Sequence, residues 1–310
     1  DRLLTEVSET IDLAAGIDDR LVCQSHIMRG AIMLIRGDVD RAASDFDETD
    51  RLAERLRIPA LIARSMAWRA ARALLSGDLT ECGVLLSDYE AYCKREPASG
   101  GANAAAGLRY RLQYERGDLG DLEGLLEAVI DAQPTVPVWR MALCGVYLQS
   151  DRLELAVPHV QAIAADDFAM VPRNALFLLT CASTARIAAQ VGSLEAAESA
   201  YRYAAPFDDQ FAWSADYLEL PIGVGVGAAA TALGWYDLAE QHFGRSRLLC
   251  QRAGAKSYLV ATDVHEAEML VQRAAPGDTE RATQLATQSL DASERLGLAY
   301  MKRRSQALLS

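Results

Sequence analysis

The chain has 310 residues, of which 51% are hydrophobic and 24% are charged, a composition that excludes a disordered or membrane-embedded protein. Its formal net charge of −12 would repel a polyanion, so we expect no direct binding of nucleic acid. The six cysteines form no C-x-x-C pair, which is typical of buried thiols in a reducing compartment. We therefore predict a cytoplasmic protein with no membrane helix.

A Gly-Asp pair that closes an apolar helical stretch recurs along the chain. The series runs from Gly37 to Gly277 with a mean spacing of about 40 residues. We call these positions anchors, and they are Gly37-Asp38, Gly77-Asp78, Gly117-Asp118, Ser150-Asp151, Gly192, Gly234 and Gly277-Asp278. Residues five and nine positions after an anchor, such as Ala42 and Phe46, are mostly apolar and form the buried stripe of a helix.

Each anchor separates two helical patterns, as residues 21–38, LVCQSHIMRGAIMLIRGD, illustrate for the first of them. Glycine supplies the left-handed cap of the first helix, and aspartate accepts from the free N–H groups that open the second. No segment shows the sustained alternation of a strand. The sequence thus predicts an all-α fold, a tetratricopeptide-like (TPR-like) α-solenoid of about seven helical hairpins in a right-handed superhelix.

Three glycines at alternate positions, Gly223, Gly225 and Gly227, match part of the glycine fingerprint of a dinucleotide loop. Such a loop must follow a strand, whereas residues 211–220 are expected to join two helical hairpins. We therefore interpret the glycines as close-packing positions of one helix. Gly225→Ala should then be neutral or stabilising by up to about 1 kcal/mol if a methyl group fits, and Gly227→Leu should overpack the contact.

Four segments carry a family resemblance. They are YERGDLGDLEGLLEAVIDAQPTVPVWRMAL, AADDFAMVPRN, ALGWYDLAEQHFGRSRLLCQRAGAKSYL and APGDTERATQLATQSLDASERLGL. With them, residues 1–298 resemble the TPR-like C-terminal region of large actinobacterial signal-transduction ATPases. Members of this family carry a STAND-type, AAA-like ATPase module before this region. They also carry either an adenylate-cyclase domain at the N-terminus or a LuxR-type DNA-binding domain at the C-terminus.

The resemblance implies that residues 1–310 form a single TPR-like repeat domain, and the start at Asp1 without a methionine is expected of a fragment of a larger regulator. Its concave face would bind a protein partner, the protein's own ATPase or effector domains, or an inducer, and so regulate the attached output. The chain itself has no Walker A pattern, cyclase signature or helix-turn-helix. A purely structural scaffold for assembly or oligomerisation is the alternative.

Arginines and tyrosines on the first helices of the units indicate where a ligand would bind. The side chains predicted to face the concave surface are Arg64, Arg111, Tyr114, Arg140, Tyr147 and Arg186. Because a guanidinium fork suits carboxylates and phosphates, these residues would form a groove for an acidic peptide or a small anionic ligand. The alternative is that the arginines pair with acids of neighbouring helices.

The sequence contains no catalytic or metal-binding pattern. His26, His159, His242 and His265 stand in four different units without a partner four residues away, so we expect no metal site. No nucleophile and base form a recognisable pair, and no cofactor is expected. The sequence favours a protein that is not an enzyme.

The purified chain should neither hydrolyse ATP nor form cyclic AMP, because it has no phosphate-binding loop. Phosphate release and cyclic AMP formation, measured on pure protein, check this expectation. Turnover that disappears when a residue of this chain is mutated would contradict it.

Overall fold

The computed structural model describes residues 2–214 and 217–310, and in these ranges the chain is all-α apart from one short β-hairpin. The helices are α1 (Arg2–Ala14), α2 (Asp19–Ile35), α3 (Val39–Leu56), α4 (Pro59–Ser76), α5 (Leu79–Arg95), η1 (Pro97–Ser99), α6 (Ala102–Arg116), α7 (Leu122–Ala132), α8 (Val138–Gln149), α9 (Leu153–Phe168), α10 (Phe177–Gln190), α11 (Leu194–Ala204), η2 (Ala205–Phe207), α12 (Ile222–Ala232), α13 (Tyr236–Ala253), α14 (Lys256–Arg273), α15 (Asp278–Leu296) and α16 (Ala299–Leu309). The predicted all-α class is confirmed. None of the described helices is both long and apolar enough to cross a membrane.

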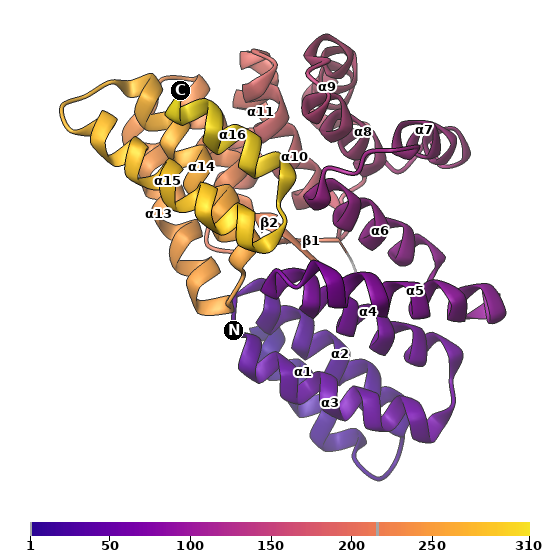
Figure 1. Cartoon of the computed structure of the whole chain (residues 1–310). Coiled ribbons are helices and arrows are strands. Elements are labelled where there is room, and N and C mark those ends of the chain that lie inside the picture. The colour runs from indigo at the N-terminus through magenta and orange to yellow at the C-terminus, as the bar shows by residue number, and fades with distance from the viewer. Residues whose placement is uncertain (1, 215–216) are drawn as a thin grey trace.

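Every anchor predicted from the sequence falls at a junction between two helices (Figure 1). Gly77 ends α4 with a φ of 82°, a left-handed conformation that glycine adopts without steric cost. Asp78 then accepts a hydrogen bond from the backbone N–H of Glu81 at 2.9 Å and caps α5. The Gly-Asp pair therefore ends one helix, starts the next and lets α5 pack against α4.

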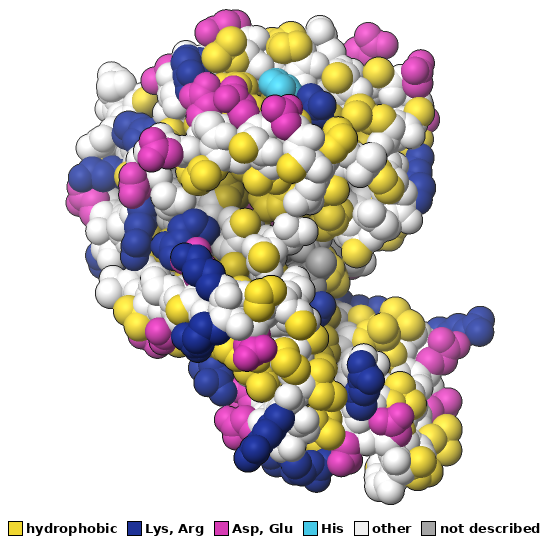
Figure 2. All heavy atoms as spheres, turned by 90° about the vertical axis from the view of Figure 1, so that its right-hand side faces the viewer, with side chains coloured by type: hydrophobic (Ala, Val, Ile, Leu, Met, Phe, Trp, Pro, Cys, Tyr) yellow, Lys and Arg dark blue, Asp and Glu magenta, His cyan; other side chains and the backbone are white. Residues whose placement is uncertain are grey.

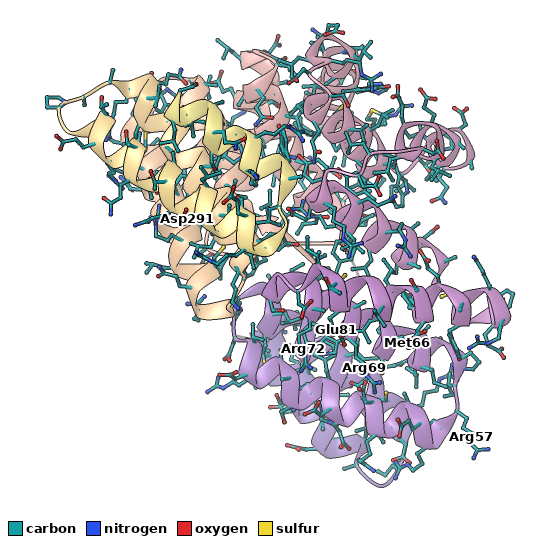
Figure 3. The ribbon with its side chains drawn as sticks, in the orientation of Figure 1. Arg57, Met66, Arg69, Arg72, Glu81 and Asp291 are labelled. Atoms are coloured by element: carbon teal, nitrogen blue, oxygen red, sulfur yellow. The ribbon has the colours of Figure 1, made fainter. Side chains whose placement is uncertain are left out.

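Ion pairs on the outer surface join neighbouring helices. Arg69 on α4 (labelled in Figure 3) pairs with Asp50 on α3 at 2.7 Å. Arg109 on α6 pairs with Glu90 on α5 at 2.6 Å. Because water competes for such partly exposed charges, each pair contributes at most about 1 kcal/mol. The packing of the helices therefore depends on the apolar core.

The C-terminal helices pack against the N-terminal half of the chain. One apolar core contains Trp68 and Leu112 from the N-terminal half and Val264 and Met301 from the C-terminal half. Figure 1 shows the orange and yellow C-terminal helices beside the violet ones, and α14 contacts α4 while α16 contacts α6. The sides of α4, α6 and α14 that meet here are buried. Seen from the side, the surface is hollowed at mid-height, with apolar side chains beside the hollow (Figure 2).

A β-hairpin interrupts the helices between η2 and α12. Its strands, β1 (Phe211–Trp213) and β2 (Leu218–Pro221), are antiparallel. The expectation that the chain has no strand was wrong here, because strands this short cannot display a sustained alternation of apolar and polar residues. Contacts with distant residues stabilise the hairpin. The hydroxyl of Tyr258 on α14 donates to the carbonyl of Leu218 at 2.6 Å.

The three alternate glycines lie inside α12, directly after β2. A strand therefore does precede them, contrary to our expectation, but it belongs to an antiparallel hairpin and not to a parallel βαβ unit. A Cβ atom on Gly225 would lie 2.3 Å from the Ala182 carbonyl oxygen of α10, and one on Gly227 would lie 2.7 Å from the Phe243 ring. Protein atoms thus fill the space beside these two glycines. The prediction that Gly225→Ala would be neutral depended on room for a methyl group, and that room does not exist.

Gly225→Ala should lower the free energy of unfolding by about 1–3 kcal/mol, because the added methyl forces α12 away from the backbone of α10. Gly244→Ala on α13 is the matched control, since a Cβ there meets no atom within 4 Å. That variant should be neutral or stabilising by up to about 1 kcal/mol. Urea unfolding of both variants measures the difference, and equal stabilities would contradict the close approach of α10 and α12.

Candidate functional site

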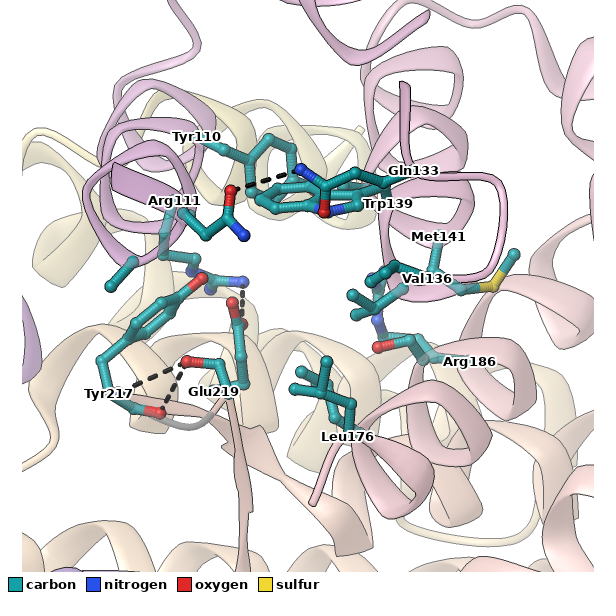
Figure 4. Close-up of a pocket in the computed structure, with 18 residues that line it drawn as sticks. Tyr110, Arg111, Gln133, Val136, Trp139, Met141, Leu176, Arg186, Tyr217 and Glu219 are labelled. Carbon is teal, nitrogen blue, oxygen red and sulfur yellow. Dashed lines mark hydrogen bonds and ion pairs between the residues drawn. The ribbon is translucent and has the colours of Figure 1, made fainter. Parts of the chain in front are cut away.

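A cavity of about 300 Å³, called the central cavity below, lies where α6, α8, α10 and the β-hairpin meet. The segment between α7 and α8 completes its wall with Gln133 and Val136. Figure 4 shows Arg111 and Glu219 along one side and Arg186 along the other. The central cavity is therefore assembled from parts of the chain that are distant in sequence.

Aromatic and aliphatic side chains form most of the wall of the central cavity. Trp139, Tyr110 and Tyr217 contribute the rings, and Met141, Leu176 and other aliphatic residues complete the wall. Close approach of α6 to the hairpin is possible because residue 107 is glycine, where a Cβ would lie 3.0 Å from the Tyr217 hydroxyl. The rings give flat apolar surfaces against which a planar molecule can stack.

Arg111 is buried beside the central cavity, with 4% of its surface exposed. Its Nη1 donates to Glu219 Oε2 at 3.0 Å, and its Nη2 donates to Glu115, one turn further along α6. The guanidinium carbon lies 5.3 Å from the ring centre of Tyr114 and 5.1 Å from that of Tyr258 on α14. Arg111 therefore connects α6, β2 and α14, and its acids lie on its own helix and on β2 and not on neighbouring helices as the ion-pair alternative expected.

Burial shifts the pKa values of the ionisable side chains around Arg111. It raises the pKa of Glu115, and the positive charge of Arg111 opposes that rise. Burial also disfavours the charge on Arg111, but Glu115 and Glu219 hold the pKa of Arg111 well above its usual value. The pKa values of Tyr110 and Tyr217 are raised well above the usual value by burial, so both phenols are neutral at pH 7.

Arg186 on α10 lines the central cavity from the side opposite Glu219 (Figure 4). It is half-buried, and within residues 2–214 and 217–310 no hydrogen bond or ion pair engages its guanidinium. A smaller recess of about 30 Å³ is lined by Arg186, Arg111, Glu219 and Ser183, all of which also line the central cavity. One end of the central cavity is therefore polar and holds a guanidinium without a carboxylate partner in the described chain.

The other residues predicted from the sequence lie elsewhere. Arg64 on α4 lines a different cavity, of about 430 Å³. Tyr114 is buried, with its ring centre 5.7 Å from that of Tyr300 on α16. Tyr147 is buried and Arg140 is half-buried, and neither of these α8 residues lines the central cavity. Of the six predicted residues, only Arg111 and Arg186 line the central cavity.

Sequence reasoning missed several residues of the central cavity. Trp139 immediately precedes Arg140, and one residue along a helix is a rotation of about 100°, so a small error in the helix register replaces one by the other. Glu219 reaches Arg111 across 108 positions of the chain, and no local pattern signals such a contact. The periodicity of single helices therefore identifies Arg111 on α6 and Arg186 on α10, but it cannot identify the residues that the hairpin contributes to the cavity.

The chain matches no protein-family model, and no curated protein matches it either. Among the side chains that the structure describes, no group of three His, Cys, Asp or Glu is placed to hold a metal ion. The chemistry of the central cavity must then be judged from its geometry. That geometry offers apolar stacking surfaces and one unpaired guanidinium, which are features of a binding site.

Arg111→Met should lower the free energy of unfolding by about 3–5 kcal/mol, because it leaves the Glu115 and Glu219 carboxylates buried without their cation. Adding Glu115→Gln should restore part of that loss. Arg109→Met, two residues earlier on α6, removes a partly exposed pair with Glu90 and should cost at most about 1 kcal/mol. Urea unfolding compares the variants, and equal losses at positions 109 and 111 would contradict the structural role of Arg111.

Proposed function

We propose that this chain is a non-catalytic sensor domain whose central cavity binds a small molecule. The observation that carries the proposal is the central cavity itself, which combines three aromatic rings with the unpaired guanidinium of Arg186. Its volume of about 300 Å³ is at the lower end of the range for small-molecule sites. Apolar walls with a few placed polar groups are the usual composition of such sites.

Binding in the central cavity would influence both halves of the chain. Its walls come from α6, α8, α10 and the hairpin, and β2 runs directly into α12. The hairpin is in turn attached to α6 through Arg111 and to α14 through the Tyr258 hydroxyl. A molecule that fits one arrangement of these segments better than another would shift the population of the two arrangements.

We propose further that the helical pairs form a TPR-like α-solenoid, a right-handed superhelix of about seven hairpins. The junctions at the anchors support this arrangement. The resemblance of residues 1–298 to the C-terminal region of actinobacterial STAND-type ATPases suggests the context. In that context, residues 1–310 would be one domain of a larger regulator, and its ligand or partner would regulate the ATPase and a cyclase or LuxR-type output.

A scaffold that oligomerises or docks another protein is the second candidate function. Leu13 and Ile17, at the end of α1 and the turn after it, favour this candidate, because 76% and 84% of their surfaces are exposed. Such an arrangement would produce self-association that no small molecule changes. Size-exclusion chromatography with light scattering distinguishes it from a ligand-binding monomer.

A panel of small metabolites should contain a compound that raises the melting temperature, since a ligand at a hundred times its Kd stabilises the folded state by about 2.7 kcal/mol. Ala142→Phe, which projects a ring into the central cavity from α8, should abolish this effect. Ala162→Phe on the exposed side of α9 is the control and should retain it. A panel without any stabilising compound, or stabilisation that survives Ala142→Phe, would contradict the sensor function.

A further inference from the structure

The charged side chains that line the central cavity differ in whether they have a hydrogen-bonded partner of opposite charge. Glu219 accepts from Arg111 at 3.0 Å, and Glu115 accepts from the same guanidinium, so both carboxylates have a hydrogen-bonded cation. Arg186 lines the same cavity and the same recess, and no acid of the described chain pairs with it. The guanidinium of Arg186 therefore lines the central cavity with no carboxylate within hydrogen-bond distance among the described residues.

A half-buried guanidinium gains most from an anion that matches its planar fork. Water only partly solvates Arg186 in a cavity with apolar walls, so a carboxylate that accepts two parallel N–H bonds is favoured there. Ser183 lies three residues before Arg186, on the same face of α10, and also lines the recess. Its hydroxyl adds a hydrogen-bond donor at the polar end.

The structure assigns the central cavity to an amphipathic monocarboxylate whose carboxylate binds Arg186 and whose flat apolar body lies among Trp139, Tyr110 and Tyr217. This inference rests on the proposed function, because it names the chemical class of the ligand that the sensor binds. The recess beside Arg186 receives the head group. The aromatic rings of the central cavity contact the rest of the molecule.

The same charges argue against two other ligand classes. A doubly charged phosphate would bring two negative charges to a site with one unpaired guanidinium, beside the carboxylate of Glu219. A zwitterionic amino acid would bring an ammonium group, but Glu219 already accepts a hydrogen bond from Arg111. A single carboxylate can accept from the planar fork of Arg186 while it adds only one negative charge beside Glu219.

Hydrocinnamate and its amide test the inference, since the two probes have the same phenyl body and differ in the head group. Isothermal titration should give a Kd for the acid at least about tenfold lower than for the amide. Arg186→Met should remove that preference, and Arg186→Lys should restore part of it, because it keeps the charge but not the fork. Arg140→Met removes another half-buried arginine, on α8 outside the central cavity, and should leave the preference unchanged.

Equal affinities of acid and amide, or an acid affinity that Arg186→Met does not change, would overturn the assignment. Failure of hydrocinnamate to bind at millimolar concentration would also overturn it. Phenylalanine as a third probe should bind more weakly than hydrocinnamate, and tighter binding would replace the monocarboxylate by a zwitterion. If the metabolite panel yields a neutral compound that Ala142→Phe displaces, the sensor function stands while this assignment fails. If no compound of either kind binds, both fail.

Discussion

The contact between Arg111 and its two carboxylates holds together the parts of the chain that surround the central cavity. Arg111 is on α6, Glu219 is on β2, and the guanidinium lies 5.1 Å from the ring of Tyr258 on α14. Three charged groups have lost most of their hydration to make this contact, which is stable only while every partner is present. The position of the hairpin, and with it one wall of the central cavity, depends on this contact.

The two arginines of the central cavity differ in what they do. Arg111 contacts two carboxylates and two aromatic rings, so its charge stabilises the fold. Arg186 has no carboxylate within hydrogen-bond distance among the described residues, so its N–H donors are available to a ligand. The same residue type thus has a structural role on α6 and a proposed binding role on α10, and the difference comes from the acids nearby. This asymmetry is the physical basis of the function that we propose.

The sequence alone predicts the features that depend on neighbouring residues. Gly77 and Asp78 cap consecutive helices through contacts within four positions, so the Gly-Asp spacing locates the helix junctions correctly. The hairpin and the contact of Gly225 with Ala182 depend on packing between distant segments, and the sequence gives no local sign of either. For the same reason, it predicts that Arg111 and Arg186 share a side of the fold but not that Glu219 pairs with one of them.

Hydrogen exchange measured with and without saturating hydrocinnamate tests the central claim most directly, because it reports on every segment of the wall at once. If the ligand binds in the central cavity, backbone amides of α6, α8, α10 and the hairpin should exchange more slowly together, although they are distant in sequence. Protection confined to residues around the cavity at Arg64, or no protection at all, would contradict the account.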